Sequence, residues 1–120
     1  MCTYMFHKFL GEIMQSYVDL YEIIADYGYD PFERIENFIL KEVIPKYECL
    51  TTVHRSYFDE CGFPAIEFYI RYNVKLSFEQ NQKLYSLVTE DIRTFCKNND
   101  LWDAYEQCCF LITVSGDAVG

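Results

Sequence analysis

The chain has 120 residues, enough for one domain with its own hydrophobic core, since independent domains most often contain about 100–150 residues. Its composition, 51% hydrophobic and 24% charged, excludes a disordered chain, and the 18% aromatic share predicts a bulky core with some tyrosines at the surface. The net charge of −9 excludes nucleic acid and anionic membrane surfaces as direct partners. It favours a basic protein partner or serves solubility alone.

Six cysteines occur along the chain, and an even number can indicate a disulfide framework. The first ten residues lack the uniformly apolar stretch of a secretory signal, and several cysteines fall within apolar patterns. We therefore expect free thiols in a reducing, cytoplasmic setting. No apolar run approaches the roughly 20 residues of a membrane span. The cysteines are Cys2, Cys49, Cys61, Cys96, Cys108 and Cys109.

Two helices are predicted in the first part of the chain. Residues 3–27 have apolar side chains at spacings of three and four, the pattern of an amphipathic helix. Asp30 then caps a second helix, with Pro31 at its first position and Glu33 completing a pattern like a capping box. Pro45 ends it, and the two helices are expected to form a hairpin. The predicted stripe of the second helix is Phe32, Ile35, Phe38, Ile39 and Val43.

The hydrophobic period then changes from about 3.6 to 2, which indicates strands. Residues 48–58 and 65–74 are predicted to form an antiparallel hairpin around the loop at 59–64. The expected buried side chains of the second strand are Ile66, Phe68, Ile70, Tyr72 and Val74, and the opposite, partly open face carries Glu67, Tyr69, Arg71 and Asn73.

A third helix and a last strand complete the prediction. Ser77 and Gln80 form a capping box at the start of this helix, which ends at residues 98–100. Residues 101–105 indicate one helical turn, residues 107–114 alternate as a strand, and the tail at 115–120 is expected to be frayed. The expected buried face of the third helix is Leu84, Leu87, Val88, Ile92, Phe95 and Cys96.

The predicted fold is a single α+β domain over residues 1–120, in the order α-α-β-β-α-β, with a three-stranded, mainly antiparallel sheet packed on helices. The last strand can lie antiparallel beside the first strand or parallel beside the second. We prefer the first placement, because antiparallel pairs are commoner.

No motif for catalysis, metal binding or cofactor binding is present. The chain has no Gly-x-Ser-x-Gly elbow, no phosphate-binding glycine loop and no paired Cys-x-x-Cys. His54 and Ser56 share one side of a predicted strand, but their spacing is too wide for a direct hydrogen bond. We therefore predict no catalytic residue, no metal and no cofactor, with a small enzyme that uses His54 as the least favoured alternative.

Acidic and tyrosine side chains gather near residues 17–36. Residues 1–45 contain eight acids and three bases, a net charge of −5. Spacings of three and four place several of these acids on one helix face, and tyrosine combines contact area with a polar tip. The pattern is also that of a solvated helix face. The predicted partner-binding residues are Asp19, Glu22, Asp26, Tyr27, Tyr29, Asp30, Glu33 and Glu36.

In type, the chain resembles small acidic protein inhibitors such as toxin-immunity proteins and anti-CRISPR proteins. That resemblance implies a non-enzymatic module that inhibits or neutralises a basic partner, such as a nuclease or toxin. Its acidic side chains would occlude the partner's nucleic-acid or active-site groove. The alternative is a structural or oligomerising domain that uses the open sheet face or a sheet edge.

Overall fold

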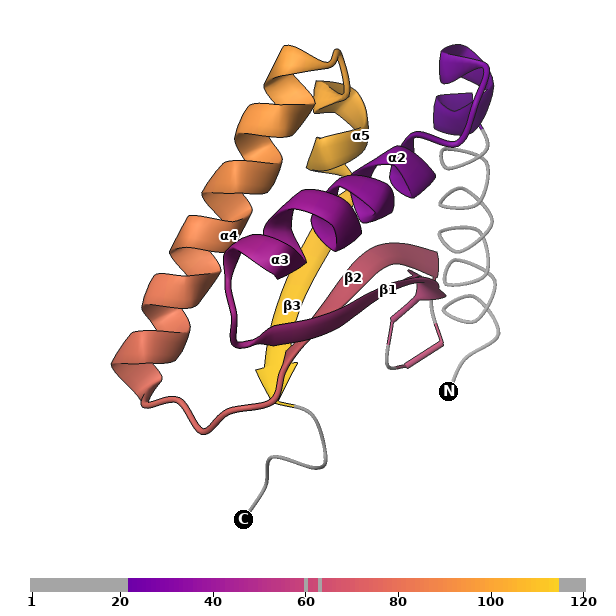
Figure 1. Cartoon of the computed structure of the whole chain (residues 1–120). Coiled ribbons are helices and arrows are strands. Elements are labelled where there is room, and N and C mark those ends of the chain that lie inside the picture. Colours follow the sequence, from indigo (N-terminus) through magenta and orange to yellow (C-terminus); the bar gives the residue numbers. More distant parts are fainter. Residues whose placement is uncertain (1–21, 60, 63, 115–120) are drawn as a thin grey trace, which may run out of the picture.

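The computed structural model describes residues 22–59, 61, 62 and 64–114. The order α-α-β-β-α-β is confirmed, with residues 22–27 as the described part of the first helix (Figure 1). Predictions for residues 3–21, including most of the helical hairpin, and for the tail at 115–120 lie outside the described residues. The elements are α2 (Pro31–Phe38), the π-helical turn η1 (Ile39–Val43), α3 (Ile44–Lys46), β1 (Leu50–Phe58), β2 (Pro64–Tyr72), α4 (Phe78–Asn98), α5 (Trp102–Glu106) and β3 (Cys108–Val114).

The sheet has the strand order β1-β2-β3 and is mixed. β1 and β2 pair antiparallel, which confirms the predicted hairpin, whereas β3 pairs parallel with β2. Our preferred placement of the last strand beside β1 is therefore wrong. Helix α4, whose 21 residues extend about 30 Å, carries the chain back to the end of the sheet where β2 begins, which sets the direction of β3 but suits either edge. The edge is decided by helix packing: α2 and α3 pack against β1, whereas α4 packs against β3, on the side of β2 away from β1.

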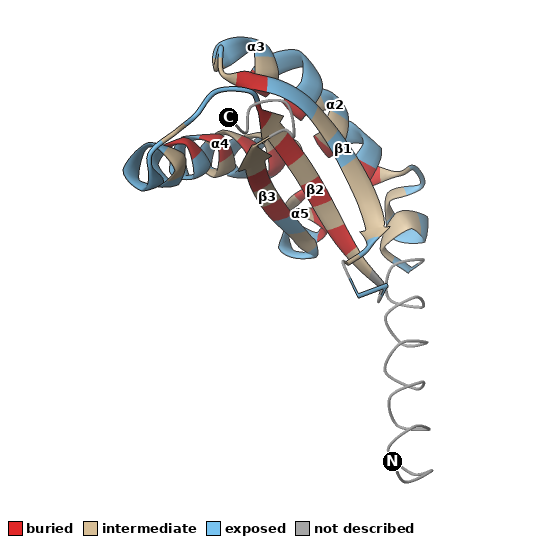
Figure 2. Ribbon diagram, turned by 90° about the horizontal axis from the view of Figure 1, so that it is seen from below, coloured by how far each residue is buried: buried red, intermediate tan, exposed pale blue. Residues whose placement is uncertain are grey.

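One face of the sheet forms the core against the helices. In β2 the side chains of Ile66, Phe68, Ile70 and Tyr72 are buried, and Phe110 and Ile112 of β3 continue the same face. Figure 2 shows these buried positions along the middle of the sheet. The alternation predicted for β2 is confirmed, except that Val74 lies beyond the strand and is exposed. The helices contribute Phe32, Ile35, Ile39, Val43, Leu84, Val88, Ile92, Cys96 and Ala104, and Leu101, between α4 and α5, adds to the same core.

The second helix begins and ends near the predicted residues but contains an unpredicted wide turn. The Asp30 carboxylate accepts hydrogen bonds from the Phe32 and Glu33 amides, and Pro31 occupies the first turn, as predicted. The π-helical turn η1 comes directly before Pro45, where the Ile44 amide bonds to the carbonyl of Ile39. Pro45 cannot donate a backbone hydrogen bond and its ring crowds the preceding turn, which a wider turn relieves.

Helix α4 confirms its capping box and corrects its buried face. The Ser77 amide donates to the Gln80 side chain over 2.8 Å, and the Gln80 amide donates to the Ser77 hydroxyl over 3.1 Å. The prediction that Leu87 is buried is wrong: it is 44% exposed, whereas Leu84 is 7% exposed. The buried residues recur every four positions from Leu84 to Cys96, and Leu87 lies about 60° from Leu84, outside the edge of that stripe. No helix among the described residues combines the length and apolar character needed to cross a bilayer.

Candidate functional site

The predicted partner-binding residues divide into exposed side chains and side chains that hold the fold together. Asp19 lies outside the described residues. Glu22, Asp26 and Glu33 are exposed, and none of them forms an ion pair with another described residue. The exposure of these three carboxylates is compatible with contact with a partner, and that contact stays a prediction.

Asp30 and Glu36 are engaged inside the domain. One Asp30 carboxylate oxygen accepts hydrogen bonds from Arg55 over 2.9 Å and from the Tyr57 hydroxyl over 3.0 Å. Arg55 also lies 3.4 Å from Glu36, so it joins the start of α2 to β1. Burial, and then the hydrogen bond to Asp30, raise the pKa of Tyr57 to about 12. This cluster is a structural tie, and its carboxylates have little freedom to meet a partner.

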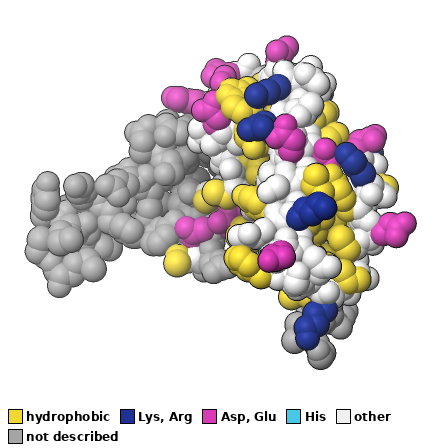
Figure 3. All heavy atoms as spheres, turned by 90° about the vertical axis from the view of Figure 1, so that its left-hand side faces the viewer, with side chains coloured by type: hydrophobic (Ala, Val, Ile, Leu, Met, Phe, Trp, Pro, Cys, Tyr) yellow, Lys and Arg dark blue, Asp and Glu magenta, His cyan; other side chains and the backbone are white. Residues whose placement is uncertain are grey.

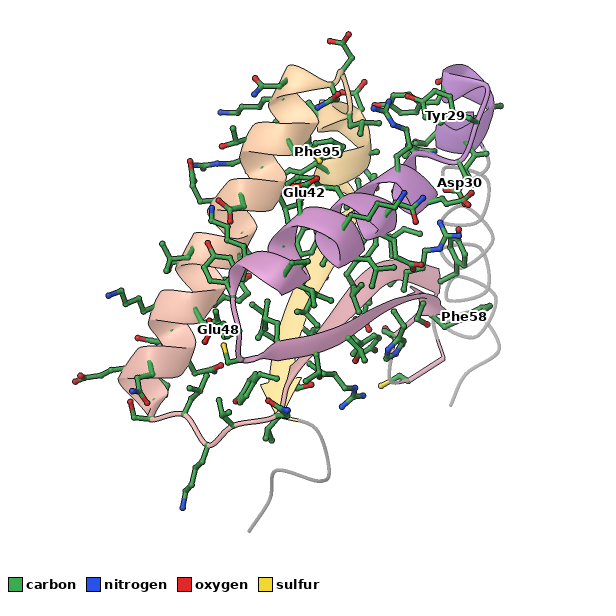
Figure 4. All side chains as sticks on the ribbon, viewed as in Figure 1. Tyr29, Asp30, Glu42, Glu48, Phe58 and Phe95 are labelled. Carbon is green, nitrogen blue, oxygen red and sulfur yellow. The ribbon has the colours of Figure 1, made fainter. Side chains whose placement is uncertain are left out.

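Tyr29 and Tyr27 lie side by side where the first helix gives way to α2. Tyr29 is 42% exposed, and its ring centroid is 5.7 Å from that of Tyr27. The Arg34 guanidinium lies 5.6 Å from the centre of the Tyr29 ring and donates a hydrogen bond to its hydroxyl. Figure 4 shows Tyr29 next to Asp30 at this end of α2. The positive charge of Arg34 therefore lies next to Tyr29. Tyr27, in contrast, lies next to aspartate side chains.

Tyr27 lines a pocket of about 230 Å³ with three aspartates. We call it the Tyr27 pocket, lined by Ile23, Asp26, Tyr27, Asp100 and Asp103. The residues come from two distant parts of the chain, the end of the first helix and the segment that joins the turn after α4 to the first turn of α5. None of the three carboxylates forms an ion pair with a described residue. Burial raises the pKa of Tyr27, and a backbone hydrogen bond with Ala104 partly offsets this, so the phenol is neutral at physiological pH.

Asp100 lies at a position where proteins usually place glycine. Its φ of 55° is left-handed, and the Leu101 amide bonds to the Cys96 carbonyl over 2.9 Å, closing the turn after α4. That bond and the buried side chains of Leu101 and Cys96 match a Schellman motif, whose left-handed residue is most often glycine or asparagine. The C-terminal end of a helix also carries partial negative charge. Aspartate adopts the left-handed conformation more readily than most residues, but glycine and asparagine are preferred there, and the charge of a carboxylate is unfavourable at this helix end.

A larger groove of about 420 Å³ separates α4 from α2 and η1. Its lining includes the stacked rings of Phe38 and Phe95, with centroids 4.1 Å apart, and Figure 4 labels Phe95 and Glu42 in the region between these helices. Two of its three charged residues, Lys46 and Asp91, pair with each other at 3.0 Å, which leaves one carboxylate, that of Glu42, without an ion pair among the described residues. The face of α4 in Figure 3 carries basic and acidic side chains mixed with hydrophobic ones. We therefore favour the Tyr27 pocket, whose three carboxylates form no ion pair with a described residue, as the candidate functional site.

His54, Ser56 and the described cysteines do not form a catalytic or metal-binding arrangement with one another. His54 is exposed and stacks on Tyr69 at 4.9 Å, while the Ser56 hydroxyl bonds to the carbonyl and amide of Phe58. Among the residues described, no group of three or more His, Cys, Asp or Glu could hold a metal ion. The described cysteines are free: Cys49, Cys61, Cys96, Cys108 and Cys109.

Comparisons with protein families, with curated proteins and with solved structures find no match for this chain. The argument for function therefore depends on the site itself.

Asp100 and Asp103 are the site residues that sequence reasoning missed. Residues 98–100 were predicted to end a helix, so an acid directly after the helix, in place of glycine, was a visible signal. No pattern within either segment of the sequence indicates that Asp100 and Asp103 lie next to Tyr27 in the fold.

Proposed function

We propose that this domain is a non-enzymatic binding module whose Tyr27 pocket receives a lysine or arginine side chain of a basic protein. The observation that carries the proposal is the meeting of Asp26, Asp100 and Asp103 around one tyrosine, without ion-pair partners among the described residues. Ile23 and the Tyr27 ring supply apolar surface for the methylene stem of a basic side chain, and the carboxylates accept hydrogen bonds from its charged end.

The position of Asp100 supports a role beyond folding. Stability alone favours glycine or asparagine at a left-handed helix terminus, and it disfavours a carboxylate at the negative end of a helix. Residues that cost stability are concentrated at functional sites, where activity maintains them. A negative charge kept at this place is what a receptor for a cationic group requires.

Inhibition is the action that best suits such a module. The net charge of −9 attracts a basic partner over a distance and accelerates the encounter. Nucleases and other nucleic-acid enzymes carry basic grooves for phosphates, and carboxylates bound in such a groove occupy the place of the phosphates. We therefore propose that the domain inhibits a basic partner of this kind by occlusion, in a reducing cytoplasm where its cysteines stay free.

The test compares two double variants with the same net charge. Asp26→Asn with Asp103→Asn neutralises the Tyr27 pocket, and Glu48→Gln with Glu79→Gln neutralises two exposed acids elsewhere. Affinity capture from the native host at low salt identifies the partner. Calorimetry then measures the affinity of the parent domain and of each variant for that partner. We expect the pocket variant to bind at least about tenfold more weakly and the control to bind nearly as the parent does.

Equal losses in both variants would mean that net charge alone attracts the partner. Recovery of no basic protein at low salt would count against the whole proposal. Inhibition itself is tested separately: the captured partner should lose its binding to a labelled nucleic acid when the parent domain is added, and keep it when the pocket variant is added.

A further inference from the structure

The larger groove between α4 and α2, which we call the α4 groove, begins where the Tyr27 pocket ends. Asn99 lines the α4 groove, and Asp100, the next residue, lines the Tyr27 pocket. Arg34 lies at this boundary, because its guanidinium donates one hydrogen bond to Tyr29 and one to Asn99. A partner segment held in the Tyr27 pocket can therefore continue into the α4 groove.

The α4 groove offers apolar surface to a large side chain. Phe38 from α2 and Phe95 from α4 stack within it, and both rings are only partly buried. The volume of about 420 Å³ exceeds the 230 Å³ of the Tyr27 pocket. An apolar or aromatic side chain bound here would cover the area of the two rings that is now exposed.

Charge indicates that the bound segment belongs to a basic protein. Lys46 and Asp91 neutralise each other, whereas the Glu42 carboxylate forms no ion pair with a described residue. The α4 groove thus adds one negative charge to the three aspartates of the Tyr27 pocket. A basic segment that also carries an apolar side chain matches both the charge and the apolar surface.

We propose that the α4 groove receives an apolar or aromatic side chain of the same partner segment whose basic side chain enters the Tyr27 pocket. This inference rests on the proposed function. Phe95 precedes Asp100 by five residues, which is about 7 Å at the rise of a helix. An extended segment advances about 3.3 Å per residue, so the basic and apolar residues should be roughly two to four positions apart.

Arg34 restricts the residues that lie between these two anchors. It is exposed and forms no ion pair with a described residue, and its two hydrogen bonds leave further N–H donors on the guanidinium. These donors can bond to a backbone carbonyl of a segment that crosses from pocket to groove. The positive charge disfavours a basic residue at the crossing. The recognised sequence is therefore a basic residue, a few residues that are not basic, and an apolar residue.

Synthetic peptides test this inference on the parent protein. The probe is a capped hexapeptide with an arginine and a phenylalanine three positions apart and alanine elsewhere. Two control peptides replace either the arginine or the phenylalanine with alanine. Titration followed by NMR measures each affinity and the amides that shift. We expect the probe to bind about tenfold or more tightly than either control peptide and to shift amides that line both hollows.

Two protein variants locate the phenylalanine of the probe. Thr94→Arg places a positive charge and a long side chain at an exposed position of the α4 groove. Gln82→Arg makes the same change in charge at an exposed position of α4 outside the groove and is the matched control. We expect Thr94→Arg to bind the probe only as well as the parent binds the peptide without phenylalanine, and Gln82→Arg to bind it nearly as the parent does. If Thr94→Arg does not fold, Asn98→Arg changes another exposed residue of the same groove.

The outcomes distinguish this inference from the proposed function. Equal affinities for the probe and for the peptide without phenylalanine, or no loss in Thr94→Arg, would overturn the role of the α4 groove and leave the Tyr27 pocket in place. Equal affinities for the probe and for the peptide without arginine, with no loss in the double variant of Asp26 and Asp103, would contradict the Tyr27 pocket itself. A probe that does not bind at millimolar concentration would also overturn the inference.

Discussion

Substitutions at Asp100 test whether its negative charge lowers the stability of the fold while it strengthens binding of a basic partner. Replacing it with glycine removes both the left-handed strain, at φ 55°, and the carboxylate at the end of α4. Replacing it with asparagine removes the charge alone, because asparagine tolerates the left-handed conformation. Both variants should therefore be more stable than the parent while they bind a basic partner more weakly.

The expected gains follow from the two contributions. A carboxylate at the negative end of a helix costs about 0.5 kcal/mol at low salt, which is the expected gain for Asp100→Asn. The left-handed conformation costs an ordinary residue about 1–2 kcal/mol, and the greater freedom of glycine in the unfolded chain cancels roughly half of that relief. Asp100→Gly should thus gain about 1 kcal/mol in all, or a rise in Tm of about 4 °C for a domain of 120 residues.

Asp103→Asn is the matched control, because Asp103 lies in the first turn of α5, where a carboxylate is favourable. Relief of repulsion among the pocket carboxylates is common to both asparagine variants. Their difference in unfolding free energy therefore isolates the helix-end effect and should be about 1 kcal/mol in favour of Asp100→Asn. Urea unfolding at low and high salt measures it, and salt should shrink this difference. The reasoning fails if Asp103→Asn is equally stabilising or if Asp100→Gly lowers Tm.

Three further predictions concern the fold. In chemical unfolding, Leu84→Ala should lower the free energy of unfolding by about 3 kcal/mol and Leu87→Ala by less than about 1 kcal/mol, because only Leu84 is buried. Equal losses would contradict the orientation of α4. Ser77→Ala should cost about 1 kcal/mol and leave the m-value unchanged, since it removes one half of the capping box. The pKa of Tyr57 is raised to about 12 in the folded state, so its stabilising effect is complete below pH 10.0 and is lost as pH rises toward 12; Tyr57→Phe should remove that part of the alkaline decline in Tm.

Local features of the chain were predictable because their causes lie within a few residues. The carboxylate of Asp30 and the hydroxyl of Ser77 bond to amides two or three residues away, so a short stretch of sequence contains the whole helix cap. Alternation along β2 likewise determines which side chains are buried once that strand has formed. The element order and the α+β class follow from such signals.

Contacts between distant residues were decided by the tertiary structure. Arg55 joins Asp30, 25 residues earlier, and so engages a predicted binding residue in a contact within the domain. The packing of α2 and α3 against β1, and of α4 against β3, places β3 parallel beside β2, against the general preference for antiparallel pairs.

The same division applies to the candidate site. The sequence by itself determined that the domain is acidic, that Asp26 and Tyr27 lie near the end of one helix and that residues 98–100 end another. Only the packing of those two helix ends brought Asp100 and Asp103 to Tyr27. Local patterns depend on hydrogen bonds within one turn or one strand, whereas the pocket depends on how buried apolar faces align whole helices.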